Sequence, residues 1–540
     1  MMGGSVASKI PEMQGVMEST IRGAHAATIA QRRLLPILFA VATLAGPAHA
    51  QVLTRPERTG WLETSSYQDV MAVLRELAAE GIAVDTFGYS FEGRALPVAR
   101  WGRGPTRVLV FANIHAGEVE GKEAAQILLR ELAAGRHAEW GGALTLWVAP
   151  IYNADGNERV SLVNRPLQLG PLGGMGQRPN AQGLDLNRDF MKLDAPETRS
   201  LVGLMTRIDP HVVIDLHTTN GTYHAYHLTY APPLHPGTDA AIDAYLRESW
   251  LPEVTRTLAP RWLTYYYGNL PEAGVDGADD ATAPRAWYSF DHRPRFGTNY
   301  IGLRNRFGIL SEAYAYLTFE ERVEATNRFV DALLDFTAAH GGEIRRIAER
   351  ADAESLVGKE LPLRAEAALS AAEVEILLGA VAEERHPYTG RRMLRRLDEV
   401  RPERMPEYGR FRATESGLVP AAYLVPAGLA GALDVLAAHG IRFHALAATE
   451  TKEVEVFAIT ASSQAEREFQ GHRERTLEGA WGRASRVIPP GTIVVPMDQP
   501  LARLAFALLE PRSDDGLVAW SALDAALEGA GEYPILRDPR

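Results

Sequence analysis

The chain has 540 residues and a net charge of −12, with 46% hydrophobic and 23% charged residues, the balance of a globular protein long enough for two domains. The acidic excess argues against nucleic acid as a partner, because a polyanion is repelled by a surface of the same sign. The absence of cysteine excludes disulfides, thiolate metal ligands and a cysteine nucleophile, so an exported chain would rely on core burial and bound metal for its stability.

The first fifty residues have the pattern of a secretory signal. Arg32 and Arg33 precede the apolar run 34–42, and the small residues of 48–50 suit a cleavage that would leave Gln51 first. The apolar run is too short for a membrane span, so we expect no stable membrane insertion after processing. The paired arginines also fit a twin-arginine export signal, but only loosely. We predict an exported protein, periplasmic or secreted, with residues 1–50 as its signal peptide or precursor segment.

Helix and strand patterns alternate from residue 67 onward. Apolar residues recur at helical spacing within 67–81, which predicts an amphipathic helix. The pattern continues with strands near 96–99, 108–112, 144–151 and 212–214 and with helices at 121–134 and 319–339. This rhythm predicts an α/β fold, with a mainly parallel or mixed sheet flanked by helices.

Two long stretches interrupt this pattern. Residues 164–183 are rich in glycine and proline and predict a functional loop. Residues 271–297 are acidic, then aromatic and basic, and are expected to form one wall of a substrate cleft. The charged residues 343–354 are expected to lead out of a first domain that spans 51–345.

Residues 356–540 have no metal or nucleophile motif. Their apolar runs predict strands at 422–425, 454–457 and 492–495 and helices at 429–438 and 501–509. We therefore predict a smaller C-terminal α+β domain over 356–540. Its role is open, and we interpret it as a structural or sheltering appendage rather than a substrate-binding element.

Two histidines and one glutamate stand where buried strands should end. His115 and Glu118 follow the apolar run 108–112, and His217 follows 212–214. Two imidazoles and a carboxylate are the ligand set of an open catalytic zinc site, which leaves a coordination position for water. The ends of such strands are also where open α/β sheets place their sites.

The order of further motifs along the chain makes this signal specific. Asp185-Leu186-Asn187-Arg188-Asp189 lies between the two ligand segments, and Glu312 follows the apolar run 307–310. The ordered set resembles the zinc carboxypeptidase family, the M14 metallopeptidases, from about Tyr67 to about His340. The resemblance implies one zinc ion per chain, held by three residues: His115, Glu118 and His217.

The resemblance also implies roles for other residues. Glu312 matches the general base, which takes a proton from the zinc-activated water, and Asp185 should hydrogen-bond the non-ligating nitrogen of His115. Asn187 and Arg188 match the pair that grips the terminal carboxylate of the substrate.

Two assignments stay open. Arg178 precedes Asn187 at the spacing of the arginine that stabilises the oxyanion in the cytosolic branch of the family, whereas the digestive spacing makes Arg165 a competing candidate. The tyrosine that caps the substrate has no clean match, and Tyr288 and Tyr300 are both available.

Two more histidines, His224 and His227, lie in the alternating, strand-like stretch 222–227. We interpret them as structural or cleft-lining residues rather than as a second metal site.

The sequence thus predicts an exported zinc-dependent metallocarboxypeptidase, a hydrolase that acts on peptides with a free C-terminus, with cell-wall peptides among the candidate substrates. Two alternatives stay open: a deacylase of N-acyl amino acids, similar to the desuccinylase and aspartoacylase enzymes, and a non-catalytic peptide-binding module.

Overall fold

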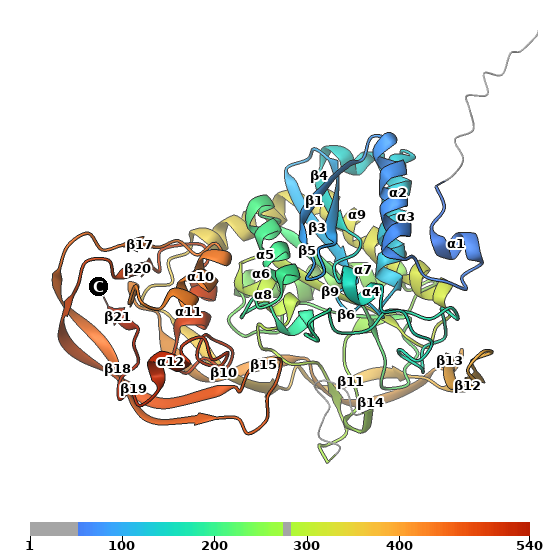
Figure 1. Ribbon diagram of the computed structural model, residues 1–540. Helices are drawn as coiled ribbons and strands as arrows, with labels where there is room; N and C mark the ends of the chain where they lie inside the picture. Colours follow the sequence, from blue (N-terminus) through green and yellow to red (C-terminus); the bar gives the residue numbers. More distant parts are fainter. Residues whose placement is uncertain (1–51, 274–281, 540) are drawn as a thin grey trace, which may run out of the picture. The chain divides into compact units, whose positions relative to one another are not determined.

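The computed structural model describes residues 52–273 and 282–539, and its central element is a mixed sheet of eight strands (Figure 1). In spatial order the strands are β1 (Ala83–Tyr89), β2 (Ala95–Gly102), β4 (Leu144–Ala149), β3 (Thr106–Ala112), β5 (Val212–Thr219), β9 (Phe307–Tyr314), β6 (Leu228–Ala231) and β7 (Thr264–Tyr266). The run from β4 through β3 and β5 to β9 is parallel, while β1, β2 and β6 pair antiparallel with their neighbours. The predicted α/β fold with a mixed, helix-flanked sheet is confirmed.

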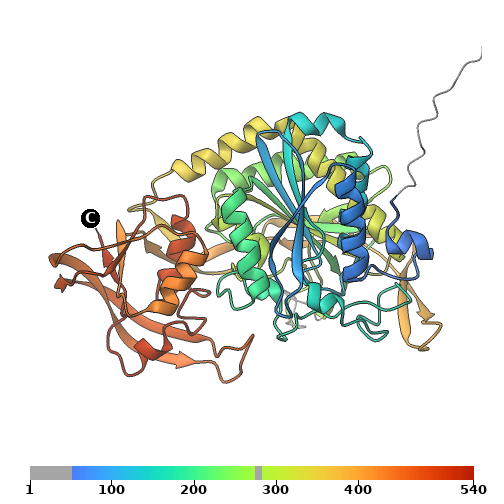
Figure 2. The same ribbon diagram turned by 45° about the horizontal axis from the view of Figure 1, so that its top comes forward.

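Helices cover both faces of this sheet (Figures 1 and 2). The longer ones are α2 (Tyr67–Ala79), α3 (Glu120–Ala133), α5 (Pro196–Ile208), α7 (Leu251–Leu258), α8 (Gly297–Leu303) and α9 (Phe319–Ala353). Helices α3 and α9 pack side by side on one face, and α5 and α8 pack on the other. All eight residues of β5 are buried, as expected of a strand covered on both sides.

Short elements complete the first part of the chain. They are α1 (Arg55–Thr59), η1 (Ala138–Gly142), α4 (Ala154–Asn157), η2 (Leu186–Arg188), α6 (Ala240–Tyr245), η3 (Leu246–Trp250), η4 (Pro271–Ala273) and β8 (Trp287–Tyr288). Most of the predicted loop 164–183 has no regular structure. The stretch 222–227, expected to be strand-like, is instead irregular, with one isolated bridge between His224 and Leu378.

Helix α9 is longer than the sequence pattern predicted. It runs on to Ala353, through residues interpreted as a charged exit from the first domain. Its added turns bury Ile344, Ile347, Ala348 and Ala351, which recur at helical spacing, so the apolar stripe rather than the charge count determined the structure.

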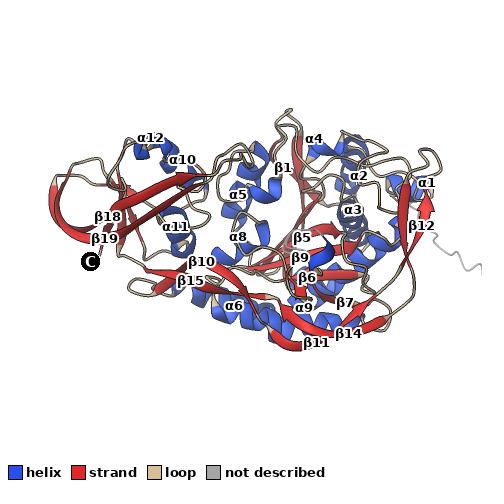
Figure 3. Ribbon diagram, turned by 90° about the horizontal axis from the view of Figure 1, so that it is seen from below, coloured by secondary structure: helices blue, strands red, loops and turns tan. Residues whose placement is uncertain are grey.

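The residues beyond α9 are rich in strands. The strands are β10 (Glu360–Ala368), β11 (Ala371–Leu378), β12 (Val381–Arg385), β13 (Arg392–Arg396), β14 (Arg401–Tyr408), β15 (Arg410–Leu418), β16 (Ala422–Val425), β17 (His444–Ala445), β18 (Glu450–Gln464), β19 (Arg475–Ile488), β20 (Ile493–Pro496) and β21 (Leu536–Asp538), and the helices are α10 (Ala430–Ala438), α11 (Ala502–Leu509) and α12 (Asp524–Leu527). Figure 3 shows β10 and β15 running on into β11 and β14 as one band of strands. This part shares a hydrophobic core with the first, and β14 pairs with β8.

The predicted signal segment, residues 1–50, lies outside the described residues. Among the helices of 52–273 and 282–539, none combines the length and the apolar composition needed to cross a membrane.

A close contact between α3 and β5 predicts how stability responds to substitution at Gly121. A Cβ atom at position 121 would lie 2.6 Å from the Cβ of Leu216 in β5 and 3.2 Å from that of Ala112 in β3. We expect Gly121→Ala to lower the free energy of unfolding by about 1–3 kcal/mol, the usual cost of overpacking a core. Urea denaturation followed by circular dichroism measures this.

The matched control is Gly342→Ala in α9, where nothing lies within 4 Å of the added methyl group. That variant should raise the free energy of unfolding by up to about 1 kcal/mol, because alanine favours a helix more than glycine does. Equal stability of the two variants would contradict the proposed tight packing of α3 on β5.

Candidate active site

The candidate site lies at the carboxyl ends of three neighbouring parallel strands. His115 and Glu118 follow β3, His217 is near the end of β5, and Glu312 is near the end of β9. In the register of β5 and β9, His217 stands directly opposite Glu312. Residues far apart in the chain therefore meet at the carboxyl ends of these central strands.

The side chains of His115, Glu118 and His217 converge on one point. Nδ1 of His115 lies 2.9 Å from Oε1 of Glu118, and Nδ1 of His217 lies 2.9 Å from Oε2 of the same carboxylate. All three residues are at most 3% exposed. A group of two imidazole nitrogens and one carboxylate, each able to offer a ligand atom within 4.8 Å of the others, is suited to zinc.

The outer nitrogens of both histidines face carboxylates. Nε2 of His115 is 3.0 Å from Oδ1 of Asp185, and Nε2 of His217 is 2.8 Å from Oδ2 of Asp215. Such partners hold the imidazole rings so that Nδ1 faces inward, toward a bound metal. The structure thus brings Asp185 to His115. The role of Asp215 was missed, although its position two residues before His217 on a strand places both on the same face.

Charge and burial set the protonation of the carboxyl groups. Burial raises the pKa of Glu118, but the two histidines and Arg165 outweigh it and hold that pKa well below its usual range. Burial raises the pKa of Glu312 to about 8, with the charges of Glu118 and Asp215 adding to the shift and His217 opposing it. A divalent cation bound beside Glu312 would lower its pKa.

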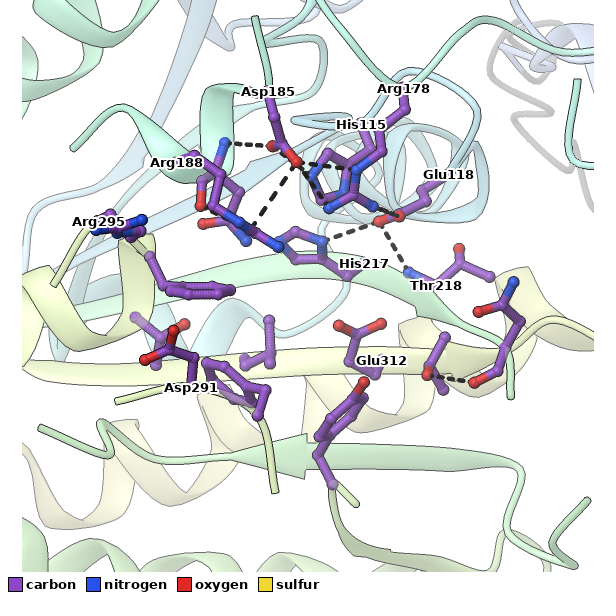
Figure 4. Close-up of a pocket in the computed structure, with 18 of the residues that line it drawn as sticks. His115, Glu118, Arg178, Asp185, Arg188, His217, Thr218, Asp291, Arg295 and Glu312 are labelled. Carbon is purple, nitrogen blue, oxygen red and sulfur yellow. Dashed lines mark hydrogen bonds and ion pairs between the residues drawn. The ribbon is translucent and has the colours of Figure 1, made fainter. Parts of the chain in front are cut away.

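These residues line a cavity of about 690 Å³ (Figure 4). Glu312 points into it from the wall opposite the histidines and Glu118. The other residues that were predicted for the site and line this cavity are Arg165, Arg178, Asp185, Asn187 and Arg188.

The three arginines of this group hold distinct positions. Arg165 donates to Oε1 of Glu118 at 2.6 Å, and Nε of Arg178 donates to Oδ2 of Asp185 at 2.9 Å. The guanidinium of Arg188 lies 3.9 Å above the ring of Phe296. Beside it, Oδ1 of Asn187 accepts a hydrogen bond from the backbone of Gly297.

The two predicted capping tyrosines do not line the cavity, so their assignment is corrected. Tyr300 is fully buried, and its hydroxyl is hydrogen-bonded to His439 and Arg304. Tyr288 donates its hydroxyl to the carbonyl of Pro284 and stacks on another ring. Tyr267 lines the cavity instead, and nothing in the run 265–267 distinguishes it from its two tyrosine neighbours.

His224 and His227 lie outside the cavity and have structural contacts. The ring of His224 packs 4.0 Å from that of Tyr314, and Nδ1 of His227 accepts the backbone N–H of Leu263. Burial lowers the pKa of His224 to about 3 and that of His227 to about 4, so both rings are neutral near pH 7.

Sequence reasoning missed a further set of lining residues. They are Asp291, Arg293, Arg295, Phe296 and Thr298 from the region before and at the start of α8, and Phe469 and Gln470 from the C-terminal part of the chain. The first set lies largely in the stretch predicted to form a wall of the cleft. The second had no signal in the sequence, because nothing local links residues near 470 to the zinc motifs.

The described residues hold two more groups of acids around a histidine, both at His137. Its nitrogens lie 3.8–3.9 Å from carboxylates of Glu131, Glu139 and Asp331, which is longer than a hydrogen bond. Two of these acids also pair with arginines, so we interpret the cluster as surface ion pairs.

Comparison with known proteins agrees with this geometry. Residues 67–289 match the family model described as "Zinc carboxypeptidase". Carboxypeptidase 2 of Trichophyton equinum and that of Trichophyton rubrum are each 22% identical to the chain over 456 residues, covering 80% of this chain and 76% of the relative.

Solved structures that resemble the chain include two bacterial metallo-carboxypeptidases. The one from Pseudomonas aeruginosa is 17% identical with a TM-score of 0.39, and the one from Burkholderia cenocepacia is 16% identical with a TM-score of 0.40. Each match covers 52% of this chain and 70% of the solved one.

The converging donors predict the metal content of the purified protein. We expect about one zinc ion per chain in the wild type and close to none in His115→Ala, because the substitution removes one of three ligands. Elemental analysis after dialysis measures this. His444→Ala changes an exposed histidine remote from the group and should keep its zinc. Equal zinc content in His115→Ala and wild type would remove His115 from the ligand set.

Proposed function

We propose that this chain, which belongs to the zinc carboxypeptidase family and is a metallopeptidase, is an exported enzyme that removes single residues from the C-terminal ends of peptides. One observation carries the proposal: the His115, Glu118 and His217 group shares a cavity with Glu312 and with the Asn187 and Arg188 pair. A metal group, a proton acceptor and a carboxylate-binding pair are the parts that this reaction needs.

The residues present fit zinc, which when bound supplies a Lewis acid that acidifies water and polarises the peptide carbonyl. Glu312 is suited to act as general base. Its carboxyl group is half-buried and faces the ligand residues across the cavity, and it has no hydrogen-bond partner among the described residues. In the proposed reaction it accepts the proton of the attacking water and delivers it to the leaving amine.

Two arginines compete for the role of stabilising the oxyanion. We assign this role to Arg178, which lines the cavity, has a side chain that is 42% exposed, and is held at Nε and Nη2 by Asp185. Arg165 is 17% exposed and is engaged with Glu118, the expected metal ligand. A guanidinium that a carboxylate holds in place and that keeps part of its surface exposed can stabilise a negative charge that develops beside it.

Arg188 and Asn187 are suited to bind the terminal carboxylate. A guanidinium has a planar fork of donors that matches a carboxylate, and the ring of Phe296 fixes the plane of this one. This part of the site distinguishes a carboxypeptidase from an enzyme that cleaves within a chain.

Export of the enzyme to the periplasm or beyond is part of the proposal and rests on the signal-like pattern of residues 1–50. N-terminal sequencing of the mature protein tests it.

The role of Glu312 predicts that Glu312→Gln keeps zinc and fold while kcat falls by about 10²–10⁴-fold. The amide has nearly the same shape but cannot accept the proton of water. Steady-state kinetics with parallel zinc analysis measure this. Glu320→Gln, at an exposed glutamate of α9, is the control and should match wild type. Near-native turnover of Glu312→Gln with zinc still bound would show that another group is the base.

The role of Arg188 predicts that cleavage requires a free terminal carboxylate. We expect wild type to release single residues from free-acid peptides and to leave the matching C-terminal amides intact, with products identified by mass spectrometry. Arg188→Lys keeps the charge but loses the fork of donors, so KM for free acids should rise by at least about tenfold.

Three other outcomes of this experiment would replace the proposal. Equal cleavage of amides would indicate an endopeptidase, and cleavage of N-acyl amino acids alone would indicate a deacylase. Binding of peptides without any cleavage would indicate a non-catalytic module.

A further inference from the structure

The loop of residues 465–474 joins β18 to β19 in the C-terminal part of the chain, yet it reaches the candidate active site. Phe469 and Gln470, at its tip, line the same cavity as His115, Glu118 and Glu312. The sequence had suggested a structural or sheltering role for this part of the chain. A direct contact with the catalytic cavity calls for a different one.

The tip of the loop has a defined shape. The backbone of Phe469 and that of His472 exchange two hydrogen bonds, of 2.8 and 3.0 Å, which close a tight turn. Gln470 within this turn has a φ of 51°, a left-handed conformation that is unfavourable for a residue with a side chain. Such a conformation persists where surrounding contacts determine it, which is common at functional sites.

Contacts with the first part of the chain hold the loop in place. Nε2 of His472 lies 2.7 Å from Oδ2 of Asp194, and the carboxylate of Glu474 lies 2.6 Å from the guanidinium of Arg295. The same guanidinium lies 5.5 Å from the ring of Phe469. The segment that follows the tip is therefore bound to the first part of the chain at two points, and one of its partners, Arg295, lines the cavity.

Gln470 acts on the residue that orients a metal ligand. Its Oε1 accepts a hydrogen bond of 2.8 Å from the backbone N–H of Asp185, 285 positions earlier in the chain. The carboxylate of Asp185 in turn contacts Nε2 of His115 and Nε of Arg178 (Figure 4). Anchoring the backbone of Asp185 thus fixes one histidine and one arginine of the site together.

Phe469 gives the cavity an apolar wall. The residue is 38% exposed, so part of its surface is open to contact with a bound peptide. Phe290, Phe296 and Leu310 are the other large apolar residues of the lining. The positive charge of nearby Arg295 is balanced by Asp515 and Glu474, so this wall offers an apolar contact rather than a cationic one.

We propose that the 465–474 loop is a working part of the active site, in which Gln470 is a positioning residue for Asp185 and Phe469 is a specificity-determining residue that contacts an apolar side chain of the peptide. The proposal rests on the proposed function, because it names residues that serve the same reaction. Under this proposal, residues of the C-terminal part of the chain help to retain the metal and to select the substrate.

The experiment compares four variants of the full chain with wild type. Gln470→Met removes the acceptor at nearly constant size, Gln470→Glu retains it, Phe469→Ala removes the ring, and Glu468→Gln is the control at an exposed neighbour in the loop. Each is assayed on free-acid peptides that differ only in carrying phenylalanine or glycine at the last or the next-to-last position. Zinc loss to a chelator is followed with each variant, and thermal melting checks the fold.

Gln470→Met should lower kcat/KM about two- to tenfold on every peptide, the usual effect of one lost hydrogen bond, and should lose zinc to the chelator faster than wild type. Gln470→Glu should restore both properties. Phe469→Ala should raise KM about tenfold for peptides with phenylalanine at one of the two positions and leave the glycine peptides unchanged. Glu468→Gln should match wild type throughout.

Several outcomes would overturn the proposal. Wild-type zinc retention and kinetics in Gln470→Met, or a Gln470→Glu variant as impaired as Gln470→Met, would remove the positioning role. An equal effect of Phe469→Ala on all peptides would remove the specificity role. If wild type cleaves no peptide, the proposed function fails, whereas the zinc-release comparison of the two Gln470 variants still decides whether Gln470 supports the metal group.

Discussion

The parallel pairing of β3, β5 and β9 is the constraint on which the site depends. Its register places His217 opposite Glu312 and brings the end of β3, with His115 and Glu118, alongside. These strands are buried on both faces, so a slip of one residue would move every side chain, the functional ones included, to the opposite face of the sheet and against other packing partners. The packing of the core therefore fixes the strand register and, with it, the relative positions of the site residues.

Asp185 is the point where the polar groups of the site are joined. Its carboxylate contacts His115 and Arg178 and accepts a hydrogen bond from the backbone N–H of Asn187. The backbone N–H of Asp185 in turn donates a hydrogen bond to Gln470. Burial would favour the neutral acid, but the neighbouring charges of His115 and Arg178 hold its pKa well below the usual range. A buried carboxylate that these charges keep ionised holds its hydrogen-bond partners in one arrangement.

The two parts of the chain are more closely joined than an appendage would require. Strand β14 pairs with β8, and Arg503 of α11 contacts both Asp239 and Glu354. One hydrophobic core includes buried residues from both parts. A shared core and charged pairs across it suppress relative motion, which is what a loop such as 465–474 needs in order to hold a side chain against Asp185.

The amino-acid pattern alone determined the elements whose signals are local. The helix at 67–81, the strands at 108–112 and 144–151 and the ordered motifs around His115, Asn187, His217 and Glu312 could be read directly, because apolar periodicity and short motif spacing encode them. Only the tertiary structure decided the rest: that the hydroxyl of Tyr300 is sealed in the core against His439, and that Gln470 meets Asp185. Those contacts join residues that lie on different elements or hundreds of positions apart, and their direction depends on how the strands and loops pack rather than on any local preference of the chain.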